Sequence, residues 1–247
     1  MSNLAGKTVL VTGASRGIGA ATAKAAAEAG SRVLLHASAP SEQAEKAAAE
    51  AGGEMIFEDL AAPGAGARLM AAAIKAAGRL DAVVNNAGIY IPSAIDADEE
   101  EWATSWARTM AVNVQAPADI CRAAIAHFRD QGGGVIVNVA SRAGHRGDGP
   151  DHAAYAASKG AVLAMTKTLA RGYSGENILF YAIAPGWVET RMAPQDIENR
   201  KNAVTDIPLG RVASPQEVAA MILFCASGAC PSATGATFDI NGASYVR

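Results

Sequence analysis

A tyrosine and a lysine lie four residues apart in the segment Tyr155-Ala156-Ala157-Ser158-Lys159. On a helix this spacing places both side chains on one face, one turn apart. A phenol has a pKa of about 10, and a cation beside its oxygen would favour the phenolate and lower that pKa. Tyr155 is therefore a candidate acid/base, tuned by Lys159. The spacing also arises by chance, and the alternative is an exposed helical pair worth a few tenths of a kcal/mol.

A glycine-rich stretch, Thr12-Gly13-Ala14-Ser15-Arg16-Gly17-Ile18-Gly19, follows the first apolar run of the chain. Its glycines permit a tight turn, and backbone amides at a helix N-terminus can face a pyrophosphate. The alternative is an ordinary turn between a strand and a helix. The position of the motif, after a first strand and at the start of a first helix, favours a nucleotide site.

These residues must be positioned by elements that alternate along the chain. Apolar, β-branched runs predict strands at 7–12, 32–37, 54–58, 81–85, 134–140, 177–184 and 236–240. Alanine-rich stretches between them predict helices at 17–29, 41–51, 64–77, 98–129, 153–173 and 215–226. Because the strands are apolar on both faces, we expect one α/β domain over residues 1–247. It is a Rossmann-like, doubly wound, seven-stranded parallel sheet with helices on both faces. Ligands then bind at the carboxyl ends of the strands.

The charge composition bears on partners. The net charge of −3 gives no basic footprint for nucleic acid or an anionic membrane, and neither partner is expected. Charged residues are 18% of the chain, below the roughly 25% typical of soluble domains. Buried surface between subunits would explain this, so we expect a homo-oligomer, a homotetramer or homodimer. Simple alanine enrichment is the alternative.

The sequence also indicates a cytoplasmic location. No amino-terminal segment resembles a signal peptide, and no apolar run approaches the eighteen or so residues that span a bilayer. Cys121, Cys225 and Cys230 are odd in number and lack metal-type spacing, so we expect reduced thiols and no metal site.

Several motifs together resemble the short-chain dehydrogenase/reductase family in its single-domain form. The glycine spacing is Gly-x-x-x-Gly-x-Gly. Further motifs follow in family order: Asn85-Asn86-Ala87-Gly88, Asn113, Ser141, Tyr155 with Lys159, and Pro185-Gly186. The resemblance extends along nearly the whole chain. It implies an oxidoreductase that transfers a hydride between a nicotinamide cofactor and a carbonyl or secondary alcohol substrate. A 3-oxoacyl thioester reductase is one such member.

The resemblance also assigns catalytic roles. Tyr155 is the acid/base, and Lys159 additionally contacts the nicotinamide ribose. Ser141 donates a hydrogen bond to the substrate oxygen where charge develops. Asn113 holds a water that connects Lys159 to solvent. The alternatives are that Ser141 forms a turn and that Asn113 is a buried hydrogen-bonding residue.

Cofactor choice follows from charge near the adenosine ribose. The second strand ends His36-Ala37-Ser38 without a carboxylate, and Arg16 and Ser38 can bind a 2′-phosphate. We therefore favour NADP(H), with NAD(H) possible; the alternative is a solvent-exposed Arg16. By resemblance, Asp59 and Leu60 contact the adenine, unless Asp59 is an exposed turn residue. The expected cofactor contacts are Gly13, Ser15, Arg16, Gly17, Ile18, Gly19, Ser38, Asp59, Leu60, Asn86, Gly88, Tyr155, Lys159, Pro185, Gly186, Val188 and Thr190.

The resemblance is weaker in three segments. The sixth strand is apolar where the family has a polar stretch. The loop at 142–152 carries two arginines and two histidines; a solvated loop is the favoured interpretation, and recognition of a polar or anionic substrate is the alternative. Residues at about 190–213 correspond to the family's variable substrate lid, with a hinge at Pro208-Leu209-Gly210.

Two other functions compete with turnover of a carbonyl. A non-catalytic nucleotide-binding regulatory or scaffold protein could use the same fold, but the complete set of Asn113, Ser141, Tyr155 and Lys159 disfavours it. A methyltransferase with a glycine-rich first turn would leave Tyr155 and Lys159 unexplained.

Overall fold

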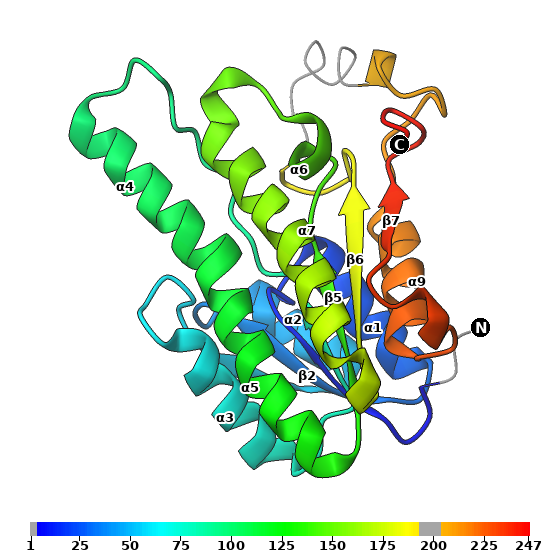
Figure 1. Ribbon diagram of the computed structural model, residues 1–247. Coiled ribbons are helices and arrows are strands. Elements are labelled where there is room, and N and C mark those ends of the chain that lie inside the picture. The colour runs from blue at the N-terminus through cyan, green and yellow to red at the C-terminus, as the bar shows by residue number, and fades with distance from the viewer. Residues whose placement is uncertain (1–3, 193–203) are drawn as a thin grey trace.

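The computed structural model describes residues 4–192 and 204–247. Within them, seven parallel strands form one sheet in the order β3-β2-β1-β4-β5-β6-β7 (Figure 1). The strands are β1 (Thr8–Val11), β2 (Arg32–Ala37), β3 (Glu54–Phe57), β4 (Ala82–Asn85), β5 (Gly134–Val139), β6 (Ile178–Pro185) and β7 (Thr237–Ile240). The predicted Rossmann-like parallel sheet is confirmed.

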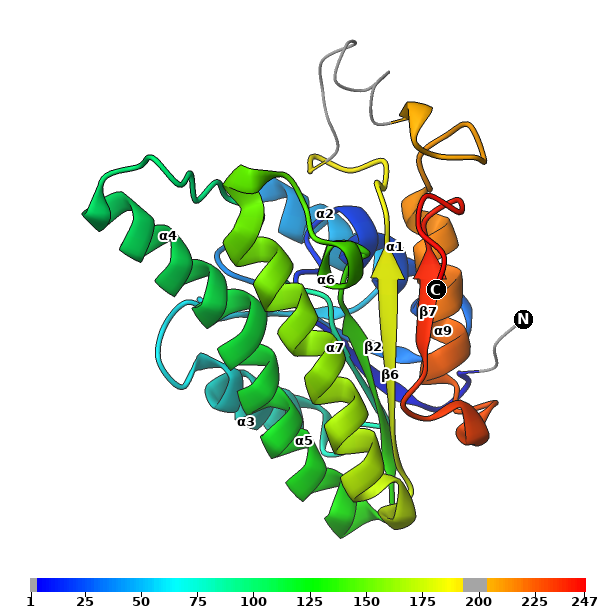
Figure 2. The same ribbon diagram turned by 45° about the horizontal axis from the view of Figure 1, so that its top comes forward.

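Helices cover both faces of this sheet (Figures 1 and 2). Helices α1, α2 and α9 pack on one face and α3, α5 and α7 on the other, each set in its own apolar cluster. The bounds are α1 (Gly17–Glu28), α2 (Glu42–Ala51), α3 (Ala65–Ala77), α4 (Glu99–Met110), α5 (Ala116–Gln131), α6 (Ala143–Arg146), α7 (Ala153–Tyr173) and α9 (Pro215–Ala226).

The strands are apolar on both faces because each face meets a helix layer. Val9 and Val11 belong to the cluster with α1 and α9, whereas Leu10 between them belongs to the cluster with α3 and α5. Alternate side chains of a strand point to opposite faces, so a strand covered on both sides reads as a continuous apolar run. Every residue of β6 is buried, which explains its apolar departure from the family pattern.

The single helix expected at 98–129 is interrupted. A π-helical turn, Ala111–Gln115, separates α4 from α5, and the Ala116 N–H donates to the Ala111 carbonyl five residues earlier. Pro117 explains the interruption: it has no N–H for the carbonyl of Asn113, and its ring would clash there in a regular helix. The turn places Asn113 at the break.

The strand order reverses between β1 and β4, which are hydrogen-bonded neighbours although β2 and β3 come between them in the chain. Connections from these two strands therefore lead away in opposite directions and leave a crevice at their carboxyl ends. The glycine loop follows β1 and the segment with Asn86 follows β4. Both predicted motifs thus meet at the switch point of the sheet.

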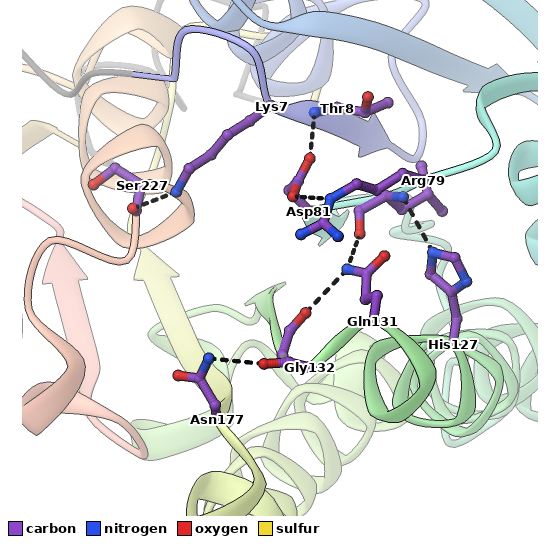
Figure 3. A network of polar contacts seen from close by, with 11 residues as sticks. Lys7, Thr8, Arg79, Asp81, His127, Gln131, Gly132, Asn177 and Ser227 are labelled. Carbon is purple, nitrogen blue, oxygen red and sulfur yellow. Dashed lines mark hydrogen bonds and ion pairs between the residues drawn. The ribbon is translucent and has the colours of Figure 1, made fainter.

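A polar network ties together the opposite edge of the sheet (Figure 3). Asp81 accepts a hydrogen bond from the Thr8 amide at 2.8 Å and one from Arg79 Nε at 2.9 Å. His127 of α5 accepts from the Leu80 amide at 3.1 Å. These bonds hold the amino ends of β1 and β4 against α5. Two further hydrogen bonds at this edge join Lys7 to the Ser227 carbonyl and Asn177 to the Gly132 carbonyl.

Candidate active site

A cavity of about 770 Å³ opens at the carboxyl ends of the strands. Of the predicted site residues, it is lined by Gly13, Ser15, Arg16, Gly17, Ile18, Ser38, Asp59, Leu60, Asn86, Gly88, Ser141, Tyr155, Lys159, Pro185, Gly186, Val188 and Thr190. Two predicted residues, Gly19 and Asn113, are not among the lining residues. The expected lid at 190–213 lies partly outside the described residues, and its role stays a prediction.

The glycine loop needs its glycines for conformation and for close approach. Gly13 and Gly17 have φ of 62° and 56°, a region that other residues rarely adopt. A Cβ on Gly19 would lie 2.2 Å from the Gly13 carbonyl oxygen. Gly19 therefore keeps the turn tight without lining the cavity. Helix α1 begins at Gly17, so its first backbone amides lie at the cavity wall.

Asn86 holds this loop in place. Its side-chain amide donates to the carbonyls of Thr12 at 2.8 Å and Gly13 at 3.1 Å. In return, Thr12 Oγ1 accepts from the amides of Asn86 at 3.0 Å and Ala87 at 2.9 Å. The ends of β1 and β4 are thus joined across the crevice, and Asn86 both lines the cavity and supports its floor.

His36 is a cavity residue that the sequence prediction did not include. Its Nδ1 accepts from the Gly13 amide at 3.2 Å, and its Nε2 bonds the Glu58 carbonyl at 2.8 Å. A carbonyl can only accept, so Nε2 carries the proton and the ring is neutral. The ring is 2% exposed, and burial lowers the pKa of His36. It connects the glycine loop to β3.

No carboxylate lies at the end of β2. Arg16 and Ser38 are exposed and line the cavity, which leaves both side chains able to meet a ligand. Asp59 is exposed, and its side chain accepts a hydrogen bond from the Ala61 amide at 3.0 Å, as in a turn. Leu60 is buried and lines the cavity. The arrangement fits a ribose end that tolerates negative charge.

Lys159 carries its ammonium into the protein interior. Lys159 is only 5% exposed, and its Nζ donates a hydrogen bond to the Val139 carbonyl at 2.9 Å. Burial lowers the pKa of Lys159 to about 8, because low-dielectric surroundings disfavour the charged form. Gly88 makes room nearby: a Cβ there would lie 3.4 Å from Nζ.

The pKa of Tyr155 is raised to about 12, so the expected lowering by Lys159 is wrong for this structure. Burial is the largest cause, and Asp148 adds to it, while a hydrogen bond with Ser141 acts in the opposite direction. Lys159 Nζ lies 5.7 Å from the Tyr155 ring centroid and is bonded to Val139. The raised pKa of Tyr155 therefore reflects desolvation of the phenol, with no contribution from the Lys159 cation in the opposite direction.

Asn113 lies behind the cavity wall. Its side chain accepts from the Ile89 amide at 2.9 Å and donates to the Ile89 carbonyl at 3.0 Å and to Ser158 Oγ at 3.1 Å. Ser158 in turn donates to the Tyr155 carbonyl at 2.7 Å. The π turn is thereby fastened both to the segment after β4 and to the helix that carries Tyr155. Its water-holding role stays a prediction.

Tyr90 is the centre of an aromatic cluster that includes Tyr155. Tyr90 meets the Tyr155 ring edge-on at 4.8 Å and 84°, and Trp187 at 6.2 Å and 89°. His152 stacks on Tyr90 at 3.9 Å and 9°. The sequence prediction missed Tyr90, although it stands two residues after Gly88. Nothing local in the sequence indicates its partners, which come from α7 and the segment after β6.

The loop at 142–152 follows the solvated interpretation only in part. Residues 146–151 are exposed. Arg142, however, is 7% exposed, lines the cavity and donates from Nη1 to Ser244 Oγ. Burial lowers the pKa of Arg142. Its place beside Ser141 makes it part of the site.

The segment after β6 forms the remaining wall. The Gly186 amide donates to the Ile240 carbonyl at 3.0 Å, and a Cβ on Gly186 would lie 2.9 Å from that of Asn241. Val188 is buried and pairs with Ala213 in an isolated bridge. Pro185, Gly186 and Val188 are therefore fixed by β7 and by the start of α9.

Within residues 4–192 and 204–247, no three or more His, Cys, Asp or Glu side chains are grouped so that they could hold a metal ion. In the same ranges, no helix has the length and apolar character to cross a membrane.

The chain is similar in sequence and in structure to known oxidoreductases. A family model described as enoyl-(acyl carrier protein) reductase matches residues 13–243. A 3-oxoacyl-[acyl-carrier-protein] reductase, FabG, of Thermotoga maritima is 35% identical over 97% of this chain and 98% of that protein. The 3beta-hydroxysteroid dehydrogenase 1 of Eggerthella lenta is 37% identical over 97% of this chain and 94% of its own. The crystal structure of a short-chain alcohol dehydrogenase from Sinorhizobium meliloti superimposes with a TM-score of 0.90, at 31% identity, over 98% of this chain and 97% of that one.

Proposed function

The chain belongs to the short-chain dehydrogenase/reductase family of oxidoreductases, and from this premise we propose that it is an NADP(H)-dependent enzyme interconverting a carbonyl compound and a secondary alcohol. The observation that carries the proposal is the convergence of Ser141, Tyr155 and Lys159 on the cavity that also contains the glycine loop. The family relationship supports hydride transfer, while the two relatives named above act on different substrates.

The cavity suits a nicotinamide dinucleotide. A pyrophosphate and two nucleosides need a tight turn that side chains would obstruct, a helix N-terminus and room to lie in. The glycine loop, the amino end of α1 and a cavity of about 770 Å³ provide them. When bound, the nicotinamide supplies or accepts the hydride. Residues of the glycine loop would hold the pyrophosphate, and Lys159 the nicotinamide ribose.

Tyr155 moves the proton that accompanies the hydride. With its pKa raised to about 12, the phenol is protonated at neutral pH and is ready to donate to a substrate carbonyl oxygen. Ser141 donates a second hydrogen bond to that oxygen as negative charge develops on it. The opposite direction requires the phenolate, which the hydrogen bond with Ser141 favours.

NADP(H) is preferred in this proposal because of the charges at the ribose end. The end of β2 offers no carboxylate to repel a 2′-phosphate, and Arg16 and Ser38 lie exposed on the cavity wall. An arginine can pair with a phosphate through two parallel hydrogen bonds. A free 2′-hydroxyl would find no acidic acceptor at the end of β2.

We further propose that the enzyme is a cytoplasmic homo-oligomer, a homotetramer or homodimer. The low charged fraction of 18% supports burial of surface between subunits. Three cysteines that are not joined in disulfides, Cys121, Cys225 and Cys230, support a reducing compartment.

The test is a panel of ketones with NADPH and NADH, followed by the near-ultraviolet absorbance of the reduced nicotinamide. We expect Tyr155→Phe to lower kcat about 10²- to 10⁴-fold, the usual contribution of a positioned acid/base, with little change in the Kd of NADPH. Tyr173→Phe, at the far end of α7, is the matched control and should keep wild-type turnover. Undiminished turnover in Tyr155→Phe would contradict the mechanism. Tight NADPH binding by a wild type that reduces no ketone would favour a non-catalytic scaffold.

A further inference from the structure

Apolar and aromatic side chains line part of the cavity, beside charged ones such as Arg142 and Asp148. Ile89 and Tyr90, which follow β4, and Trp187 and Met192, which follow β6, line it from separate segments. Tyr90 is the member that touches Tyr155, ring to ring at 4.8 Å. Met192 remains 48% exposed, so apolar surface is left uncovered at this end. Apolar surface in a cavity gains free energy when a ligand covers it.

The ring of Tyr90 is held in one orientation. His152 stacks on it nearly parallel, 3.9 Å away, and His152 is not a lining residue of the cavity. The stack therefore covers the side of Tyr90 that faces away from the cavity. The two loops are joined a second time, since the Ser93 amide donates to the Asp151 carbonyl at 2.6 Å. Tyr90 is thus a preorganised wall, which binds without the entropy cost of ordering a free side chain.

Trp187 supplies a second wall at a right angle to the first. Its ring plane is 89° from that of Tyr90, with centroids 6.2 Å apart. A flat group placed against one ring meets the other edge-on, and both stacked and edge-on contacts between rings are favourable. A ring also has few rotamers to lose, whereas a flexible acyclic chain must be ordered.

We propose that Tyr90 is a specificity-determining residue that selects substrates whose carbonyl carbon carries a ring or belongs to one, that is, aryl or cyclic ketones and their alcohols. This inference rests on the proposed function, because the carbonyl must reach Tyr155 while its ring lies against Tyr90 and Trp187. It names the substrate class that the proposed reaction leaves open.

Acetophenone and 2-octanone test it, since both are methyl ketones with the same number of carbon atoms and only one carries a ring. With the NADPH-loaded enzyme, Kd is measured for each ketone by ligand-observed NMR and kcat/KM by NADPH oxidation. We expect wild type to favour acetophenone about 10-fold in both, the size of one or two aromatic contacts.

Variants of Tyr90 separate aromatic contact from simple apolar bulk. Tyr90→Phe should keep the preference, because the ring remains. Tyr90→Leu should bring the ratio of the two ketones close to one, mainly through a higher KM for acetophenone. Tyr173→Leu is the matched control on the remote end of α7 and should keep the wild-type ratio. Circular dichroism of each variant checks that its fold is intact.

Three outcomes would overturn the inference: equal binding of both ketones by wild type, an unchanged ratio in Tyr90→Leu, or the same loss in Tyr173→Leu. Failure of the proposed function looks different. Selective binding of acetophenone that Tyr90→Leu abolishes, without reduction of either ketone, supports the role of Tyr90 in recognition and refutes the proposed chemistry.

Discussion

Lys159 carries a charge in a place where charge is costly. Its pKa is lowered to about 8 from an ordinary value of 10.5, so the unfolded chain holds this proton more tightly than the folded one. Between those two pH values the unfolded state binds more protons, and stability therefore rises with pH across that window. Below about pH 8 the full cost applies. A lysine kept here against that cost is consistent with a role in the site.

Replacing Lys159 with an apolar residue should abolish turnover and stabilise the fold. We expect Lys159→Met to lose turnover and to raise the free energy of unfolding at pH 7 by about 1–3 kcal/mol, the upper value corresponding to the full pKa shift. The gain should shrink as pH rises from about 8 toward 10.5, because the folded state of wild type is then neutral while the unfolded state is losing its proton. Urea unfolding at pH 7 and pH 10 measures this. Lys167→Met, an exposed lysine of the same helix, should change stability little at either pH; a destabilised Lys159→Met would contradict the expectation.

We expect His36 to make cofactor binding sensitive to acid, because it supports the glycine loop. Its Nδ1 accepts from the Gly13 amide, and protonation would place an N–H against that N–H. Burial lowers the pKa of His36, and the opposing effects of Glu58 and Asp59 are smaller. Its contribution to stability is therefore complete above the unfolded pKa of about 6.5. It falls as pH drops from there toward the lowered folded value.

The corresponding prediction is a weaker cofactor complex at low pH. We expect the affinity of wild type for NADH to fall severalfold between pH 7.5 and about 5.5, and His36→Gln to show a flatter profile. NADH is the appropriate probe because it lacks the 2′-phosphate, which titrates near the same pH. His127→Gln is the matched control: His127 also accepts a backbone N–H and has a lowered pKa, but at the opposite edge of the sheet. If His127→Gln flattens the profile equally, the effect is not local to the glycine loop.

At the scale of elements, the edge of the sheet remote from the cavity provides stability without taking part in chemistry. Asp81 joins β1 to the start of β4 through Thr8 and Arg79 (Figure 3). We expect Asp81→Ala to lower the free energy of unfolding by about 1–3 kcal/mol, because the buried Thr8 amide loses its acceptor. kcat and KM should stay at wild-type values. Thermal melts and steady-state kinetics measure these effects, and Asp96→Ala, in an exposed loop, is the control. A loss of activity in folded Asp81→Ala would contradict the expectation, because it would show that this edge of the sheet is coupled to the cavity edge.

Elements that depend on short-range patterns could be predicted from the sequence. All seven strands and both helix layers followed from apolar runs and alanine-rich stretches, since burial on two faces leaves a continuous signal. The π turn was missed because the 98–129 stretch has helical composition throughout. Pro117 was the available signal, as it removes the donor that the Asn113 carbonyl needs.

The site was predictable to the extent that its residues belong to ordered motifs. The glycine loop and the set with Tyr155 were recognised from spacing and order. The Tyr90 and His152 stack could not be, because its members lie 62 positions apart and meet only through tertiary structure. The sign of the Tyr155 pKa shift was likewise missed, since the residue spacing indicates a nearby cation but not how deeply the phenol is buried.

At the scale of the whole molecule, the cavity collects segments from across the chain. The glycine loop, the end of β2, the segments after β4 and β6, and α7 all line it. A ligand that contacts all of them binds the folded state and cannot bind the unfolded chain in the same way. Cofactor binding should therefore stabilise the entire fold, by about 2.7 kcal/mol at a ligand concentration of 100 Kd.

This linkage gives a test of cofactor choice that needs no substrate. If Arg16 pairs with the 2′-phosphate as proposed, we expect NADPH to raise the Tm of wild type more than NADH at equal concentration. In Arg16→Ala the Tm shift with NADPH should fall to about that with NADH, while the shift with NADH changes little. Arg171→Ala removes an exposed arginine of α7 away from the cavity and is the matched control. Differential scanning fluorimetry at several cofactor concentrations measures the shifts, and equal losses for both cofactors in Arg16→Ala would contradict the pairing with phosphate.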